Sequence, residues 1–185
     1  MTLLLGIESS CDETAASVVK NGRVVLSNIV ASQDALHIEY GGVVPEIASR
    51  AHIERILPII KEAIAAADIT VEQLDGIVVG NRPGLIGSLL VGVAAAKTLA
   101  WSLQKPLIAV DHVIAHLWAP NLSGATVEYP ALGAVVSGGH TSLLILDDPA
   151  SVTCIGKTID DAAGEAFDKA AAILELGWPG GRRID

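Results

Sequence analysis

Hydrophobic and polar positions change their spacing along the chain in a way that marks successive strands and helices. Three short apolar runs open the sequence, over residues 3–8, 15–19 and 24–30, and polar residues separate them. Apolar runs of this length, bounded by turn residues, are typical of buried strands. Asn21 and Gly22 between the second and third runs form a strong hairpin signal. The pattern predicts a meander of three strands at the start of the chain.

A helical spacing follows the meander. Between residues 46 and 67 apolar side chains recur every three or four positions, and Pro58 within this run is expected to kink or split the helix. A buried strand over residues 75–80, a long apolar helix ending at Leu103 and a further strand over residues 106–110 come next. This alternation of strands and helices predicts an α/β fold with well-buried strands.

A polar stretch over residues 121–128 contains glycine and serine and marks an expected boundary. Three more strand-like runs follow it, and a final helix is expected to open at Asp160. These runs cover residues 131–136, 142–146 and 152–159. The chain stops shortly after another glycine turn, so the second strand–helix unit looks unfinished. We therefore expect one domain over residues 1–128 and the truncated beginning of a second over residues 129–185.

Composition and charge narrow the function classes. The chain is 51% hydrophobic but only 3% aromatic, so its core must be built from small aliphatic side chains. The net charge of −9 makes it a poor binder of nucleic acid by itself, and an RNA partner would need basic surface from elsewhere. Cys11 and Cys154 form no disulfide framework, which favours a reducing, cytoplasmic location. Residues 85–101 are interrupted by glycines and a lysine, so we expect a buried helix and no membrane association.

Two histidines at helical spacing are the first candidate for chemistry. His112 and His116 stand four residues apart in an apolar run, so on a helix both imidazoles would lie on one face. Imidazole suits zinc, iron, copper and nickel, but a metal site normally needs a third or fourth ligand. The alternative is a helix with two packed or solvated histidines. Pro120 is expected to end this helix, and His52 is more typical of a helix surface than of a ligand.

Three other features could bind a ligand or serve the fold alone. Glu8 ends the first strand and faces a polar turn, which suits a phosphate, a hydrated cation or a capped turn. Ser137, Gly138 and Gly139 expose backbone N–H groups that could hold phosphate or carboxylate oxygens, although an ordinary hairpin has the same residues. On the last helix, an acidic stripe is expected on one face, which could also be simply solvated. It consists of Asp161, Glu165 and Asp168, at positions i, i+4 and i+7.

Together these stretches resemble one family, the bacterial TsaD-type tRNA adenosine threonylcarbamoyltransferases. The matching runs occur in the order of the family and cover essentially the whole chain, and their combination is highly specific although no single run is. They are residues 6–14, 40–50, 83–92, His112 with His116, residues 137–141, 160–169 and 179–181.

The resemblance implies a ribonuclease-H-like fold of the actin-like ATPase type, with the start of a second such domain. It implies transfer of threonylcarbamoyl from threonylcarbamoyl-AMP to N6 of adenosine 37 of tRNA in the cytoplasm, with TsaB- and TsaE-type proteins as partners. By the family pattern, one Fe²⁺ per subunit, or zinc, would be bound by His112 and His116, while no catalytic residue is assigned. The residues that would hold the adenylate substrate are Val135, Val136, Ser137, Gly138, Gly139, Asp168 and Gly181.

The chain also departs from this family. Asp111 stands where a third histidine is common, and the chain is considerably shorter than family members. The part it lacks carries an Asn that contacts the nucleotide and an Asp that completes the metal site, so we expect this fragment to be inactive alone.

Three other functions compete with the transferase. A non-catalytic TsaB-like scaffold lacks the histidine pair, and a sugar or acetate kinase does not explain it. A zincin peptidase needs a glutamate where Val113 stands.

Overall fold

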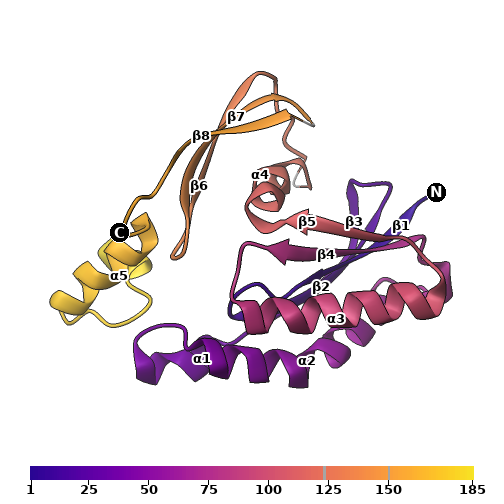
Figure 1. The fold of residues 1–185 in the computed structure, drawn as a ribbon, viewed down its shortest axis with the longest axis horizontal. Coiled ribbons are helices and arrows are strands. Elements are labelled where there is room, and N and C mark those ends of the chain that lie inside the picture. Colours follow the sequence, from indigo (N-terminus) through magenta and orange to yellow (C-terminus); the bar gives the residue numbers. More distant parts are fainter. Residues whose placement is uncertain (123, 150) are drawn as a thin grey trace. The chain divides into compact units, whose positions relative to one another are not determined.

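The computed structural model describes residues 1–122, 124–149 and 151–185, and it separates into two compact units, Met1–Ala115 and His116–Asp185 (Figure 1). The boundary between the units falls inside helix α4 (His112–Leu122), earlier in the chain than the polar stretch that the sequence suggested. The division into ribonuclease-H-like domains after residue 128 stays a prediction. Both units are mixtures of strands and helices, which confirms the α/β class.

A five-stranded mixed sheet forms the first unit, with the strand order β3-β2-β1-β4-β5. The first three strands pair antiparallel, which confirms the predicted meander, and β4 pairs parallel with both β1 and β5. The strands are β1 (Leu3–Glu8), β2 (Glu13–Lys20), β3 (Val24–Ser32), β4 (Gly76–Arg82) and β5 (Leu107–Asp111). Because β1, β4 and β5 run in the same direction, their carboxyl ends lie at one edge of the sheet.

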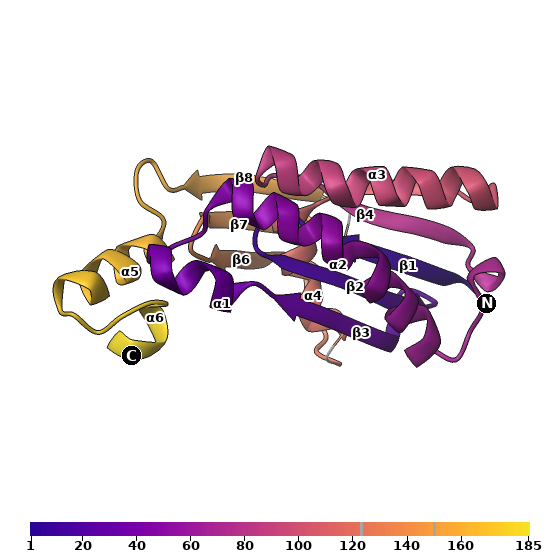
Figure 2. The same cartoon turned by 90° about the horizontal axis from the view of Figure 1, so that it is seen from below.

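Two long helices, α2 (Pro45–Ala66) and α3 (Ile86–Leu103), run along one face of this sheet (Figures 1 and 2). Pro58 was expected to kink or split the first of them. The split is wrong, because α2 is one continuous helix, and the kink stays a prediction. Proline removes a single N–H donor, and the apolar face of α2 on both sides of Pro58 is buried against the sheet. The short helices of this unit are α1 (Asp34–His37), η1 (Ile38–Tyr40) and η2 (Val71–Gln73).

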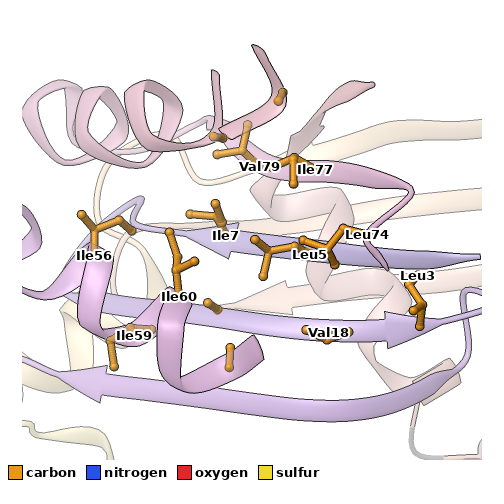
Figure 3. Close-up of a cluster of buried hydrophobic side chains, with 14 residues drawn as sticks. Leu3, Leu5, Ile7, Val18, Ile56, Ile59, Ile60, Leu74, Ile77 and Val79 are labelled. Carbon is orange, nitrogen blue, oxygen red and sulfur yellow. The ribbon is translucent and has the colours of Figure 1, made fainter. Parts of the chain in front are cut away.

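The core of the first unit lies between the sheet and these helices (Figure 3). Alternate residues of β1 point into it, as the two-residue period of a strand requires, and Leu5 is completely buried. Ile56 and Ile60 of α2 meet Val18 and Ile77 from the strands in the same cluster. Each such side chain contributes about 1.5–3 kcal/mol by its removal from water, so this aliphatic core holds the sheet edge in place.

Among the described residues, α3 is the helix that is long and apolar enough to cross a membrane. One face of it packs on the unit through small residues, among them Gly92 and Ala96. A Cβ at Gly92 would collide with the Ser9 hydroxyl, so α3 packs closely against the residue that follows β1. The opposite face, with Ile86 and Leu90, is exposed. The prediction of a buried helix is therefore right for one face only.

The second unit is built on a three-stranded antiparallel sheet in the order β6-β7-β8, which confirms the three predicted strands. Its elements are β6 (Ala131–Val136), β7 (Thr141–Asp148), β8 (Ser151–Lys157), α5 (Ala163–Ile173) and α6 (Gly181–Ile184). Helix α5 begins later than the expected Asp160, because the Thr158 hydroxyl bonds the Asp161 carbonyl and Thr141 accepts from the Ala163 N–H. Helix α4 continues through Pro120 to Leu122, so the expectation that Pro120 ends it is wrong. Pro120 lies in the last turn, where its missing N–H costs the helix one backbone hydrogen bond.

Candidate functional site

The carboxyl edge of the first sheet brings together two residues that are far apart in the sequence. Glu8 is the last residue of β1, and His112 follows directly after β5. The Glu8 Oε2 atom lies 3.3 Å from the His112 Nδ1 atom, and the Ser10 Oγ atom lies 3.2 Å from the same nitrogen. The backbone N–H of Ser10 donates to Glu8 Oε1 at 2.5 Å. A carboxylate, a hydroxyl and an imidazole thus form one compact group.

The electrostatics of this group follow from partial burial. Burial raises the pKa of Glu8, but the hydrogen bonds from His112 and Ser10 outweigh it and hold the pKa below its usual value. The bond to Glu8 in turn raises the pKa of His112, and burial opposes this shift. Glu8 is therefore a carboxylate near neutral pH, where it can only accept hydrogen bonds.

Asp111 determines where helix α4 begins. Its Oδ1 atom accepts hydrogen bonds from the backbone N–H groups of Val113 and Ile114, at 3.0 and 3.2 Å. This is the bonding of an N-cap residue, which satisfies donors that have no partner inside the helix. The aspartate that departs from the family pattern therefore has a structural role, because it starts the helix with His112 in its first turn.

His116, the other predicted ligand, lies one helical turn further along α4 and belongs to the second unit. It lines a mostly apolar hollow of about 250 Å³ with Leu117, Pro120 and residues of β6 and β7. The two imidazoles suit iron or zinc, and the carboxylate on His112 Nδ1 is the kind of partner that metal-binding histidines have. The residue types on α4 are therefore ones that such an ion accepts as ligands. Among the described residues, no group of three or more His, Cys, Asp or Glu side chains is placed to hold a metal ion.

The loop after β1 carries Cys11 and Asp12, and Glu13 follows them as the first residue of β2. Although Cys11 is partly exposed, desolvation and the charge of Asp12 raise the pKa of its thiol to about 12. A thiol with such a pKa stays protonated at neutral pH and is a poor nucleophile. Burial, with the charges of Asp12 and Asp34, also raises the pKa of Glu13.

His52, which the sequence placed on a helix surface, is completely buried, so that interpretation is wrong. Its Nε2 atom lies 3.0 Å from the Cys11 carbonyl oxygen, and a carbonyl can only accept, so Nε2 carries the hydrogen. The other nitrogen, Nδ1, then accepts from the Thr14 hydroxyl at 2.8 Å and from the Gln33 side-chain amide at 3.4 Å. This network attaches the loop after β1 to helix α2.

The network continues from Gln33 to a second buried histidine. The Gln33 amide also donates to the Ala48 carbonyl at 3.4 Å, and its oxygen lies 3.4 Å from His37 Nε2. The backbone N–H of Val44 donates to His37 Nδ1 at 3.3 Å. Each ring thus has one donating and one accepting nitrogen, which is the pattern of neutral imidazole.

The buried network gives a pH dependence with a definite sign. Burial lowers the pKa of His52, and the bond to the Cys11 carbonyl opposes this shift. The unfolded chain, with a histidine pKa of about 6.5, therefore binds the proton more tightly than the folded chain. Stability from His52 is fully present above that pKa and is lost as the pH falls toward the lowered folded value.

We therefore expect the stability difference between the parent chain and His52→Gln to shrink as the pH falls from 7.5 to 5. Urea denaturation at several pH values measures it. A difference that grows toward acid would contradict the assignment of His52 as neutral.

In the second unit, the predicted glycine turn is tightly built at one end and open at the other. The Ser137 hydroxyl and the Ser137 and His140 backbone groups bond to one another across the turn, at 2.8–3.1 Å. Gly164 at the start of α5 donates to the Ser137 carbonyl, and a Cβ at Gly164 would collide with this turn. Space around Gly138 and Gly139 is open within 4 Å of where their Cβ atoms would be.

The neighbouring predicted residues keep different roles. Val135 is buried, so only its backbone could reach a ligand, whereas the side chain of Val136 is exposed. Asp168 Oδ1 accepts a hydrogen bond of 2.6 Å from the Gly180 N–H, which brings Asp168 beside Gly181. The second unit thus joins Ser137 to the start of α5, and Asp168 to the final glycine turn.

The acidic stripe predicted on the last helix is not formed as expected. Asp161 lies before α5, and the Lys169 ammonium group bonds both Asp161, at 2.6 Å, and Glu165, at 3.1 Å. Asp168 points instead to the backbone of Gly180. Periodicity placed the three carboxylates on one face, but the helix starts too late for Asp161 to belong to it.

Glu8 as a partner of His112, and His52 as a buried anchor, were missed by sequence reasoning. A signal for the first existed, because strands that run parallel bring their carboxyl ends together. No signal in the sequence indicated the second, since a histidine among helix residues looks the same whether it is exposed or buried.

Comparison with known proteins identifies the family. The family model described as TsaD, tRNA N6-adenosine threonylcarbamoyltransferase, matches residues 24–185. Proteins of that name are 54% identical in Syntrophomonas wolfei, 56% in Treponema denticola and 57% in Rhodopirellula baltica, each over 98–99% of this chain. The chain covers only 51–54% of these proteins, so it spans about half the length of the curated relatives it matches.

Solved structures agree on the fold. YeaZ from Pseudomonas aeruginosa has a TM-score of 0.55 at 20% identity and covers 85% of this chain and 67% of its own. The ethanolamine utilization protein EutJ from Carboxydothermus hydrogenoformans has a TM-score of 0.55 at 12% identity and covers 96% of this chain and 59% of its own. At such identities the likeness shows the fold alone, which is of the actin-like ATPase type. The sequence matches show more: the chain belongs to the TsaD family of tRNA N6-adenosine threonylcarbamoyltransferases.

Proposed function

We propose that this chain contributes to the transfer of a threonylcarbamoyl group from threonylcarbamoyl-AMP to N6 of adenosine 37 of tRNA. The observation that carries the proposal is the identity of 54–57% to proteins named for this transferase activity, over nearly the whole chain. The stretches in which the sequence resembles the family include the glycine turn and the histidine pair of α4.

The adenylate donor is proposed to bind in the second unit. An anionic phosphate or carboxylate needs N–H donors that bulk does not cover, and open space around Gly138 and Gly139 supports such a role. Ser137 holds the turn through its own hydrogen bonds, so the glycine N–H groups would be presented without rearrangement. Asp168 fixes the last glycine turn through Gly180, with Gly181 open beside it, and Val135 and Val136 would contribute backbone.

His112 and His116 are proposed to bind one Fe²⁺ ion, or zinc in its place. When bound, such an ion would supply a Lewis acid for an oxygen of the donor. The chain's own part is to hold two imidazoles on α4, to start that helix at Asp111 and to keep Glu8 against the first ring. Two histidines leave coordination positions of the ion open to further ligands.

The proposed partners are tRNA and proteins of the TsaB and TsaE type, in the cytoplasm. The net charge of −9 indicates that this chain is not the main contact to tRNA, because phosphate contacts need lysine and arginine, of which this chain has few. Basic surface for tRNA would then come from the partners of this chain.

A chimaera tests the proposed function. Residues 1–185 would replace the matching half of the Syntrophomonas wolfei relative, and the chimaera would be incubated with TsaB- and TsaE-type proteins, threonylcarbamoyl-AMP and unmodified tRNA. Digestion and mass spectrometry should detect threonylcarbamoyladenosine, and a tRNA with guanosine at position 37 should give none. A folded chimaera that binds its partners but forms no product would contradict the transferase and favour a scaffold.

A further inference from the structure

Glu8 reaches His112 across a strand. In the sheet, β4 lies between β1, which ends in Glu8, and β5, which leads into His112. At the point of crossing β4 has Gly80, and a Cβ there would collide with the Glu8 carboxylate. The contact between Glu8 and His112 therefore depends on a missing side chain in the strand between them.

Glu8 is also fixed from its other side. Oε1 accepts from the Ser10 N–H, while Oε2 faces the His112 ring. Both carboxylate oxygens are thus engaged within the protein, which favours neither of the ligands considered from the sequence, a phosphate or a hydrated cation. The capped turn is present, since the Ser10 N–H is satisfied, but a cap alone does not require the contact with His112.

The direction of that contact defines the protonation of the ring. An ionised carboxylate has no hydrogen to donate, so a bond between Glu8 Oε2 and His112 Nδ1 needs the hydrogen on Nδ1. A neutral imidazole with its hydrogen on Nδ1 has its lone pair on Nε2, which is then the nitrogen able to bind a metal.

We propose that Glu8 is the positioning residue of His112, holding its ring in the Nδ1–H tautomer so that Nε2 becomes the metal-binding atom. The proposal rests on the metal-binding role of His112 in the proposed function. Carboxylates that hold metal-binding histidines in this way orient the ring and raise its basicity, and their loss weakens metal affinity by about 10–100-fold.

Titration of the 185-residue chain with Co²⁺, a spectroscopic probe for iron and zinc sites, measures the effect. Glu8→Gln, which keeps the shape of the side chain, should weaken binding by about 10–100-fold. Glu8→Asp keeps the negative charge but moves the carboxylate away from the His112 ring, so it should also bind Co²⁺ more weakly. The matched control is Glu13→Gln: Glu13 acts on the His112 pKa through its charge, and a screened charge should change affinity about threefold or less. Equal affinity of Glu8→Gln and the parent would overturn the proposal.

Gly80→Ala tests the same contact without touching a charged residue. The added methyl group should displace the Glu8 carboxylate and reproduce the loss of Co²⁺ affinity. Gly76→Ala, at the other end of β4, is the control. A Cβ there would press on the flexible end of the Leu4 side chain at 3.1 Å, which can shift, and would meet the Pro106 carbonyl at 3.5 Å, which is ordinary van der Waals contact. Equal affinities of the two alanine variants would count against the crossing at Gly80.

Nitrogen-15 NMR of the metal-free chain gives a readout that needs no metal. At a pH above the His112 pKa, the His112 ring, assigned with His112→Ala, should carry its hydrogen on Nδ1 in the parent and shift toward Nε2–H in Glu8→Gln. The amide spectrum of each variant checks that it is folded. An Nε2–H ring in the parent overturns the proposal. If no chain binds Co²⁺, the metal part of the proposed function fails, and the tautomer alone decides the role of Glu8.

Discussion

Replacing His52 with alanine is expected to lower the free energy of unfolding by about 3 kcal/mol. The change leaves the Cys11 carbonyl and the Thr14 hydroxyl without their partner inside the first unit. A buried polar group that loses its partner costs about 1–3 kcal/mol, and the space left by the imidazole adds a cavity cost. The loop that follows Glu8 should become mobile at the same time, because His52 attaches it to α2.

Urea denaturation at pH 7.5 measures the loss, and the neighbouring residue supplies a matched control. Ile53 follows His52 on α2, but its side chain is 64% exposed, so Ile53→Ala should cost less than about 0.5 kcal/mol. Similar losses for the two variants would show that the network around His52 contributes little to stability.

The second large effect is expected from His112→Ala combined with His116→Ala. The parent chain should contain close to one iron or zinc ion per chain after anaerobic purification, and the double variant should contain none. Imidazoles are donors that suit such ions, and the double variant has neither of these two. Glu8 stays beside the former position of the first ring, and its oxygens bond Ser10 and His112 in the parent.

Elemental analysis measures the metal content, and His140→Ala controls for the loss of a histidine as such. His140 contributes its backbone to the glycine turn, so its ring can be removed without breaking those bonds. Metal retained by the double variant would show that the ion binds elsewhere. A parent without metal would show that two imidazoles do not suffice.

Elements that depend on local pattern were predictable from the sequence. The alternating apolar residues of β1 and the helical period of α2 describe how each element meets one core, and the structure follows both closely. Pro120 was misjudged because a proline near the end of a helix removes only one backbone hydrogen bond. The start of α5 was misjudged because the hydroxyl of Thr141, the first residue of β7, accepts a hydrogen bond from the first N–H of the helix.

The candidate sites were predictable as residues but not as partnerships. The glycine turn and Asp168 could be named from their motifs, and the structure adds that Gly164 and Gly180 are what hold them. Their binding roles, and that of the histidine pair, stay predictions. The pairing of Glu8 with His112 depends on strand order, and the burial of His52 depends on partners from three separate segments. Neither is encoded in a period of two or of 3.6 residues.

The strand order also has a consequence for how the protein is made. During synthesis β1 to β3 leave the ribosome before β4, which is the parallel partner of β1, and roughly 70 residues separate β1 from β4. At about 5–20 residues per second, one edge of an apolar strand stays open for about 4–14 s before its partner exists. Translation speed through this interval therefore sets how long the nascent chain can pair with a wrong strand.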